Sequence, residues 1–388
     1  MKVGVSPTTR PTVFPLALGA AVIVTTEFLF VGALPAIAVS LQITESHASI
    51  LISLFALSAA ILGPLLTLVW SDYSPTVVLK RCMLALMLSH LALAMVPNLW
   101  LHGGIRILQG ALLTPFISVA SALAAELAPP KDKILAVARV NLGTIMGIVF
   151  VVPAFIALEA YLGLTVLFLL LAGASLLTHV LLPSTPVPAS QTSSIANQLG
   201  ILKQPMVLRH LAASALTFAV LFMPYSFIRL FINHAFGTAF LGTNETVASL
   251  VLLLFGIAGI WGNSLAAHHV EKHPRLTTGI LTTAVALCTA MLSVVTNGAW
   301  LNLLLFALWG TAHSGSFLAC QIRVMQATPQ ARAFALSLNI AVCNLGIAIG
   351  ASAGSIALSH GGLGFIWPGC ILLSALTITV LARTSRQV

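Results

Sequence analysis

Long apolar runs separated by short polar segments make up most of this chain of 388 residues. An α-helix needs about 20 mainly apolar residues to cross the hydrocarbon core of a bilayer, and most of the runs reach that length. The pattern therefore predicts twelve membrane-spanning helices. We place them at 12–38, 48–70, 77–97, 99–125, 135–158, 162–182, 208–233, 246–267, 275–296, 299–326, 332–358 and 362–382.

One interruption between the apolar runs is longer than the others and differs in composition. The stretch 183–205 contains Pro183, Pro186 and Pro188 together with several serines, which is typical of a connecting segment. It separates six predicted spans from six. We therefore expect an all-α integral membrane protein with an N-terminal six-helix half at 1–182, a linker at 183–205 and a C-terminal six-helix half at 206–388.

Composition and charge agree with a membrane protein. Only 6% of the residues are charged and 59% are hydrophobic, whereas soluble domains carry about 25% charged residues. If the N-terminus is cytoplasmic, all of the 17 lysines and arginines except Arg106 and Arg229 fall in cytoplasmic segments or adjoining helix ends. This bias predicts cytoplasmic termini and explains the net charge of +9 without a nucleic-acid partner.

Several classes of chemistry have no motif in the chain. The cysteines lie in or beside apolar runs without CxxC spacing, which argues against a metal centre or a disulfide framework; they are Cys82, Cys288, Cys320, Cys343 and Cys370. No GxxxxGK[ST], HExxH or GxSxG sequence is present. We therefore expect no catalytic residues, no bound metal, no cofactor and no ATP-driven motor.

The candidate chemistry begins with Glu27, a carboxyl group in the middle of the first apolar run. A charge at that depth costs roughly 2.5–3.5 kcal/mol on insertion scales, so intramembrane acids usually serve a pathway, a relay or a partner charge. Glu27 is therefore a candidate proton-binding group, and Thr25 and Thr26 can bind it or a substrate through their hydroxyls. The alternative is a structural acid that locks the first span against a neighbour.

Arg106 in span 4 and Arg229 in span 7 are the other charges inside predicted spans. Arginine stays protonated, so Arg106 can hold a carboxylate or a substrate oxygen, and Gln109 three residues later shares its helix face. Arg229 and Tyr225 are candidates for the substrate cavity or its gate. The alternatives are arginines that extend to the membrane surface and a tyrosine that anchors the helix there.

Glycines repeat at intervals of four residues in two spans, at Gly143 and Gly147 and at Gly346, Gly350 and Gly354. Such spacing produces a smooth helix face on which another helix packs closely or slides. The amides in the same spans need partners in hydrocarbon, so we list them as cavity candidates: Asn141, Asn339 and Asn344. The histidines within spans are interpreted as ordinary helix contacts: His90, His179 and His313.

These residues resemble the major facilitator superfamily, and within it the drug:proton antiporter-1 group that includes arabinose and other sugar efflux permeases. The resemblance rests on Thr25-Thr26-Glu27-Phe28 with Gly32-Ala33-Leu34-Pro35, on the asparagines and glycines of span 11, on Tyr225-Ser226-Phe227-Ile228, and on Arg106, Gln109 and Gly110. It implies a monomeric carrier in a bacterial inner membrane. Such a carrier works by alternating access and exports a sugar or drug-like solute against entering protons.

Two segments depart from that group's pattern. The loop after span 2 reads Ser71-Asp72-Tyr73-Ser74-Pro75-Thr76 where the group has an arginine and a glycine, and Val152 precedes Pro153 where the group has glycine. An uncoupled facilitator or an uptake permease is therefore the alternative within this fold. A membrane sensor or scaffold that transports nothing is the alternative of another class.

Overall fold

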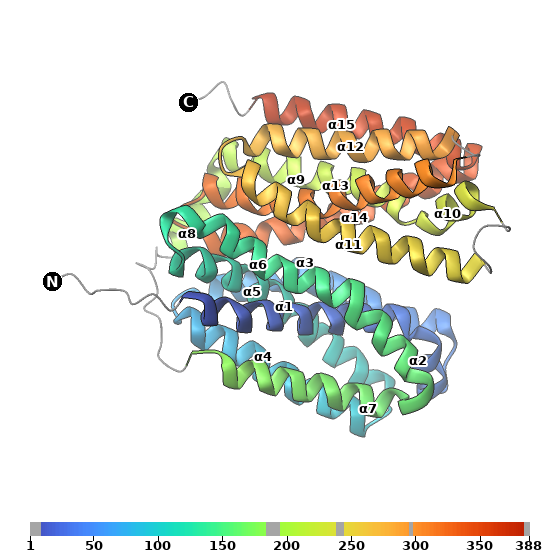
Figure 1. The fold of residues 1–388 in the computed structure, drawn as a ribbon. Helices are drawn as coiled ribbons and strands as arrows, with labels where there is room; N and C mark the ends of the chain where they lie inside the picture. The colour runs from blue at the N-terminus through green and yellow to red at the C-terminus, as the bar shows by residue number, and fades with distance from the viewer. Residues whose placement is uncertain (1–8, 184–194, 238–243, 295–297, 384–388) are drawn as a thin grey trace. The chain divides into compact units, whose positions relative to one another are not determined.

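The computed structural model describes residues 9–183, 195–237, 244–294 and 298–383. Within these ranges every regular element is helical, and twelve spans are long and apolar enough to cross a membrane, which confirms the predicted number. The chain divides into two compact units, Met1–Ile195 and Ala196–Val388 (Figure 1). Of the predicted linker, residues 184–194 lie outside the described residues.

The described part of the first unit is built from seven α-helices, with two shorter helical segments between them. It comprises α1 (Thr9–Gly32), α2 (Leu34–Leu41), α3 (Glu45–Val69), α4 (Pro75–Met95), α5 (Leu99–Leu127), η1 (Pro130–Asp132), α6 (Lys133–Met146), η2 (Gly147–Val151) and α7 (Val152–Leu181). Polar side chains cap three of these helices, since Thr44, Ser74 and Asn98 accept hydrogen bonds from the backbone N–H of the third residue that follows.

The second unit has the same plan. It comprises α8 (Ile195–Gly200), η3 (Ile201–Lys203), α9 (Pro205–Tyr225), α10 (Ile228–Phe236), α11 (Asn244–Val270), α12 (Pro274–Val294), α13 (Ala299–Ala327), α14 (Arg332–Gly361), η4 (Leu363–Phe365) and α15 (Ile366–Arg383). Proline stands at the start of α9 and α12, where its missing N–H costs no hydrogen bond.

The predicted spans 12–38 and 208–233 are each broken near their second end. The first splits at Ala33, whose backbone is not helical and which is followed by Pro35 in the first turn of α2. The second splits between α9 and α10, at Phe227. The prediction that Arg229 lies inside span 7 is therefore wrong, because this residue belongs to the separate helix α10.

Predicted spans 5 and 6 are joined within one helix, a feature that the pattern of apolar residues does not indicate. The fifth span contains a π-helical turn, η2, directly after α6. Its continuation then joins the sixth span within α7, across a bend at Gly163. Gly163 has φ of 72°, in a region that residues with a Cβ rarely adopt, so glycine permits the bend.

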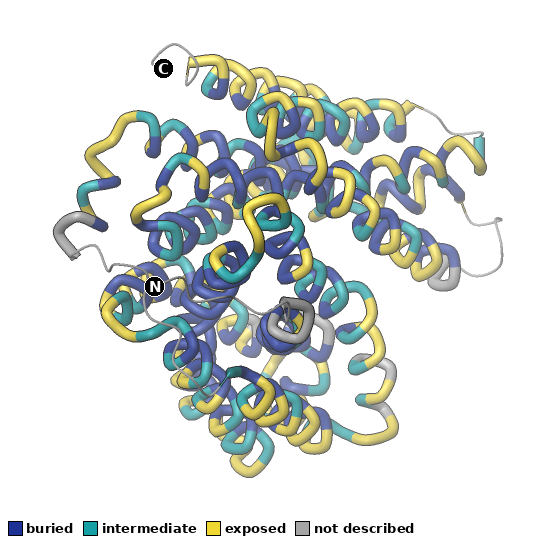
Figure 2. Tube along the Cα trace, turned by 60° about the vertical axis from the view of Figure 1, so that its left-hand side comes forward, coloured by how far each residue is buried: buried dark blue, intermediate teal, exposed yellow. Residues whose placement is uncertain are grey.

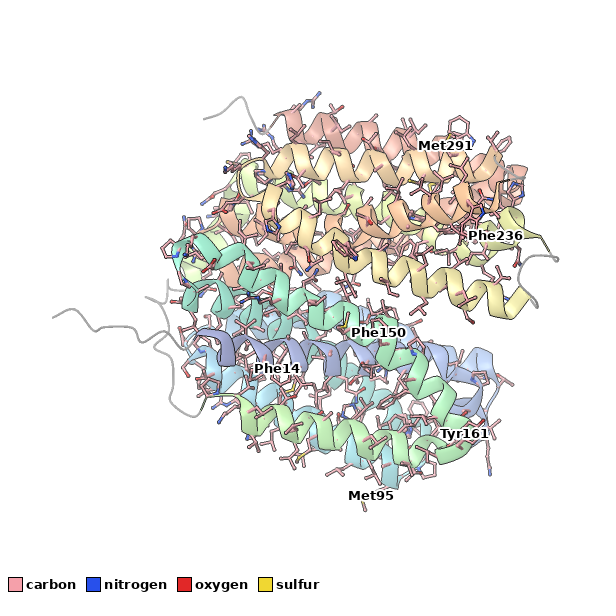
Figure 3. The ribbon with its side chains drawn as sticks, viewed as in Figure 1. Phe14, Met95, Phe150, Tyr161, Phe236 and Met291 are labelled. Carbon is pink, nitrogen blue, oxygen red and sulfur yellow. The ribbon has the colours of Figure 1, made fainter. Side chains whose placement is uncertain are left out.

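Most of the long helices bury one stripe of their surface and expose another, whereas α5 is buried almost all round (Figure 2). Large apolar side chains occupy much of the exposed stripes, among them Phe14, Met95 and Tyr161, which are labelled in Figure 3. On a soluble protein such a surface would cause aggregation. Around a membrane protein it is the surface that faces lipid.

The two units repeat one close contact between helices. In the first unit Gly110 of α5 lies against the backbone carbonyl of Phe55 in α3. In the second unit Gly310 of α13 lies against the backbone carbonyl of Phe255 in α11. Each glycine allows two backbones to approach more closely than any side chain permits. The repeat therefore matches α5 with α13 and α3 with α11.

A second contact repeats in the same way. Gly143 of α6 lies against the carbonyl of Ala17 in α1, and Gly346 of α14 lies against the carbonyl of Ala215 in α9. The predicted role of the glycines in helix packing agrees with this geometry. The remaining glycines of the two rows continue the same contacts along the helices, at Gly147, Gly350 and Gly354.

Gly110→Ala should destabilise the first unit. A methyl group at this position overlaps the Phe55 carbonyl, so α3 and α5 must separate. Overpacking of this kind costs about 1–3 kcal/mol. We expect a lower melting temperature of the purified protein in detergent. The control is Gly104→Ala in the same helix, where nothing lies within 4 Å of the added carbon; equal melting temperatures of the two variants would contradict the packing described here.

Candidate functional site

Arg106 of α5 is the centre of a buried polar cluster in the first unit. Its side chain has no exposed surface. Its Nε donates to the carbonyl of Leu51 in α3 at 3.2 Å, and Nη1 donates to the carbonyl of Thr26 in α1 at 3.0 Å. A longer bond of 3.5 Å runs from Nη2 to the carbonyl of Glu27. One guanidinium therefore ties together the backbones of three helices.

Two aromatic rings cover the faces of this guanidinium. The Cζ atom of Arg106 lies 4.0 Å from the ring centroid of Phe30 and 4.2 Å from that of Phe55. The faces of aromatic rings attract cations, most strongly where water is absent. Carbonyl oxygens in its plane and rings on its faces thus stabilise a positive charge inside an apolar unit.

Hydrogen bonds extend the cluster from α5 to α4. Arg106 Nη1 donates to Gln109 Oε1 at 3.1 Å, and Gln109 Nε2 donates to Ser89 Oγ at 3.0 Å. Ser89 in turn donates to the carbonyl of Leu86. The predicted pairing of Arg106 with Gln109 on one helix face agrees with this geometry, and the amide fixes the position of the guanidinium.

A second chain of hydrogen bonds runs from α1 through α4 to α7. Thr26 Oγ1 lies 3.0 Å from Nε2 of the buried His90, and Ser175 Oγ lies 3.4 Å from its Nδ1. Both hydroxyls also donate to carbonyls of their own helices, those of Val22 and Leu171. In that orientation each hydroxyl presents a lone pair to the ring. Rotation of one hydroxyl turns an acceptor into a donor, so this chain accommodates a proton on either ring nitrogen.

Glu27 lies next to both chains of hydrogen bonds, and its carboxylate has different contacts from its backbone carbonyl. The backbone carbonyl accepts from Arg106, as described above, whereas no hydrogen bond of the described residues reaches the carboxylate oxygens. The side chain is half-buried. It thus combines restricted contact with water, a fixed positive charge nearby and freedom from hydrogen-bond partners, which suits a group that gains and loses a proton.

Other predicted residues of the first unit lie around this cluster. Thr25 is buried, and its hydroxyl has no hydrogen-bond partner among the described residues. A Cβ on Gly147 would come within 3.3 Å of that hydroxyl, so the glycine leaves it room. Asn141 is buried in α6, on the helix whose Gly143 packs against α1. Of the predicted residues of this unit, the structure brings together Thr26, Glu27, Arg106 and Gln109.

Tyr225, at the end of α9, lies in an aromatic cluster of the second unit. Its ring centroid is 4.9 Å from that of His313, 5.5 Å from that of Phe222 and 5.7 Å from that of Phe255. Among the described residues no hydrogen bond connects these rings; Phe222 meets Tyr225 edge to face, and the rings of Phe255 and His313 are tilted against it. Tyr225 is half-buried, and it presents an aromatic wall rather than a charge.

The other predicted residues of the second unit lie on α10 and α14. Arg229 is half-buried in α10. Asn339 is buried in α14, and its Oδ1 has no hydrogen-bond partner among the described residues. Asn344, further along the same helix, is half-buried.

The repeated glycine contacts allow equivalent positions of the two units to be compared, and the residues at these positions differ in chemistry. Glu27 follows Ala17 by ten residues, and Tyr225 follows Ala215 by ten residues. The two alanines make the equivalent contacts described above. The position of the carboxyl group in the first unit is therefore held by a tyrosine in the second.

The same comparison applies to the arginine. Arg106 precedes Gly110 by four residues, and Phe306 precedes Gly310 by four residues. Phe306 is fully buried and stacks on Trp309, with ring centroids 5.8 Å apart. The polar cluster of the first unit thus corresponds to an aromatic cluster in the second.

Sequence reasoning missed several members of the polar cluster. His90 was interpreted as an ordinary helix contact, but it joins three helices through two hydroxyls. A usable signal was the pair Ser89-His90 in the middle of an otherwise apolar span. Phe30, Phe55 and Ser175 gave no such signal, because phenylalanine and serine are common in membrane helices.

No group of three or more metal-ligating side chains is found in the described ranges of the chain. The cluster around Arg106 contains one carboxylate, one histidine and one permanent cation, so it is suited to protons and polar solutes.

Comparisons with known proteins agree with this fold. A family model described as the Major Facilitator Superfamily matches residues 16–351. The inner membrane transport protein YdhP of Escherichia coli K12 is 28% identical over 96% of this chain and 95% of its own length. A probable sugar efflux transporter of Pasteurella multocida is 25% identical, covering 91% of this chain and 87% of that protein.

Solved structures show the same fold. The proton:xylose symporter XylE has a TM-score of 0.71 with 16% identity, over 97% of this chain and 95% of that one. The Escherichia coli fucose:proton symporter FucP has a TM-score of 0.73 with 14% identity, over 97% and 100% of the two chains. Because the family model spans most of the chain, this protein belongs to the Major Facilitator Superfamily and is a multi-pass membrane transporter of small molecules rather than an enzyme.

Proposed function

We propose that this transporter exports a small polar or amphipathic solute in exchange for protons, with Glu27 as the proton-binding group and Arg106 as its fixed positive charge. The observation that carries the proposal is the attachment of the Arg106 guanidinium to the backbone of Thr26 and Glu27, while the Glu27 carboxylate has no hydrogen bond with any described residue. When deprotonated, the carboxylate is attracted to the guanidinium. When protonated, it loses that attraction, so α1 is held to the guanidinium of α5 by the backbone hydrogen bonds alone and moves relative to α5 at a lower cost.

The direction of transport is inferred from the names of two relatives, and the class of solute from those names together with the surroundings of Tyr225. Two relatives from Pasteurella multocida and Helicobacter pylori carry the name probable sugar efflux transporter. The half-buried aromatic ring of Tyr225 suits the apolar face of a sugar or a drug-like ring. On this proposal the protein acts as a monomer in a bacterial inner membrane with cytoplasmic termini, and the proton gradient is its energy source in place of a cofactor.

Glu27→Gln should uncouple transport from protons. The amide keeps the shape of the side chain but cannot ionise, so we expect proton-driven accumulation to fall by about tenfold or more. Exchange of labelled for unlabelled solute should persist. The measurement is uptake into inside-out vesicles under an imposed pH gradient, with radiolabelled L-arabinose, D-xylose and D-glucose as first solutes.

The matched control for this experiment is Glu126→Gln, which removes an exposed carboxyl group at the end of α5. Its accumulation should stay within about twofold of wild type, as expected for an exposed charge. Unchanged proton-driven accumulation in Glu27→Gln would sink the proposal. Wild-type flux that ignores the pH gradient would identify a facilitator instead.

The hydrogen bonds from Thr26 through His90 to Ser175 position the proton-binding group in this proposal. They hold the residue next to Glu27 against α4 and α7, so the position of the carboxylate depends on them. Buried hydrogen bonds of this kind contribute about 0.5–1.5 kcal/mol each, and a buried partner left unpaired costs more.

His90→Leu removes both bonds at once, and we expect it to lower the melting temperature and to reduce proton-driven accumulation. The control is His179→Leu, since Nδ1 of His179 makes one bond between the same two helices, to the carbonyl of Lys80. That variant should lose some stability while it keeps its coupling. Equal coupling in the two variants would contradict the positioning role of His90.

A further inference from the structure

A second buried arginine, Arg323 of α13, is bound quite differently from Arg106. Its side chain is 1% exposed, although the distribution of charge along the sequence placed it among the residues at cytoplasmic helix ends. Its Nη2 donates to Ser214 Oγ at 2.7 Å, to the carbonyl of His210 at 3.1 Å and to Cys320 Sγ at 3.8 Å. Its Nε and Nη1 have no hydrogen-bond partner among the described residues.

This arrangement leaves three of the five N–H groups of a buried guanidinium unpaired, since Nε carries one hydrogen and Nη1 carries two. Arg106 bonds through all three of its nitrogens and lies between two aromatic rings. A buried charge without partners costs several kcal/mol.

The second unit offers Arg323 no counter-charge among its described side chains. The acidic side chain described there is that of Glu271, which is exposed after the end of α11. The described surroundings of Arg323 therefore lack an anion.

Unpaired polar atoms gather at the same level of the unit. His210 Nδ1 and Thr217 Oγ1 on α9 have no partner among the described residues, and these residues flank Ser214 on one side of that helix. Asn339 Oδ1 on α14 is also unpaired. The contacts of Gly346 with Ala215 and of Gly350 with Ala219 show that α9 and α14 run in step, which places Asn339 near the level of His210.

The repeat shows that this polar group is particular to the second unit. Counting from the equivalent glycines and alanines, the first unit has apolar residues at three of the four corresponding positions, and the polar Thr12 at the position of His210. Leu123, Leu16 and Ala136 correspond to Arg323, Ser214 and Asn339 respectively. A group that served helix packing alone could be apolar in both units.

We infer that Arg323, with Ser214, His210 and Asn339, forms a binding subsite for the carboxylate of a hydroxylated organic acid. The unpaired Nε–H and Nη1–H groups lie on different edges of the guanidinium, and each can donate a charge-assisted hydrogen bond to a carboxylate oxygen. The unpaired amide, imidazole and hydroxyl groups around it suit the hydroxyls of the same solute. The inference rests on the proposal that this chain carries small solutes, and it narrows their class to acids.

The test compares acids with neutral counterparts of the same shape, using the purified full-length protein in detergent. The probes are D-glucuronate against D-glucose, D-galacturonate against D-galactose, and D-gluconate against D-glucitol, at constant ionic strength. The readout is the melting temperature followed by tryptophan fluorescence. We expect at least one acid to raise the melting temperature of the wild type more than its neutral counterpart does.

Variants connect that shift to the subsite. Arg323→Gln should abolish the acid-specific shift, and Ser214→Ala should reduce it because Ser214 holds the guanidinium in place. Lys272→Gln, which removes an exposed cation between α11 and α12, should leave it unchanged. The inference is overturned if no acid exceeds its neutral counterpart in the wild type, or if the shift survives in Arg323→Gln.

Arg323→Met keeps the inference falsifiable if the glutamine variant misfolds. An apolar side chain of similar length removes the unpaired charge, so without ligand this variant should melt at or above the wild-type temperature. A clear loss of stability would show that Arg323 is structural and would overturn the inference.

Vesicle flux separates this inference from the proposed function. If neutral sugars move with protons and no acid raises the melting temperature more than its neutral counterpart, the inference is wrong and the proposed function stands. An acid-specific shift that depends on Arg323, in a protein that moves no solute with protons, supports the subsite and defeats the proposed coupling.

Discussion

The binding of the Arg106 guanidinium to backbone carbonyls is the interaction on which the first unit depends. Carbonyls of α1 and α3 accept from it, Gln109 extends it to α4, and two phenylalanine rings cover its faces. A cation in hydrocarbon is tolerated only where dipoles replace the water it has lost. Because those dipoles come from separate helices, their relative positions are fixed by one side chain. The carboxyl group of Glu27 then lies next to a charge that its own protonation does not remove.

The second unit shows what the same framework becomes without that cation. Glycine contacts with the carbonyls of Phe55 and Phe255 show that the helices pack alike in the two units. Tyr225 and Phe306 nevertheless take the places of Glu27 and Arg106. At these positions the first unit thus has charged side chains and the second has aromatic rings. The buried arginine of the second unit, Arg323, lies elsewhere on α13. Equivalent backbones therefore support different chemistry, because close packing depends on a few glycines and leaves the neighbouring side chains free to differ.

The number of spans and their approximate ends could be predicted from the sequence because apolar length is a local property. The breaks at Ala33 and Phe227 could not, since the short helices that follow them continue the apolar run. Glu27, Arg106 and Gln109 were identified because charged and amide groups are rare in such spans. The partners of Arg106 were not, because backbone carbonyls belong to every residue and give no signal in the sequence. The role of His90 depends on hydroxyls of two helices that are distant in sequence, so it could not be predicted from its own span.

The π-helical turn at η2 has a geometric consequence for the path of the first unit. An α-helix places residues four apart on one face, whereas a π-helical turn holds more residues than an α-helical one. The stripe of α6 that carries Gly143 therefore does not continue in register along α7. α6 packs chiefly against α1, whereas α7 packs chiefly against α4. The hydrogen bonds that join α7 to α4 come from Ser175 and His179, which follow the bend at Gly163, so the turn at η2 and that bend together give the segment its different neighbours.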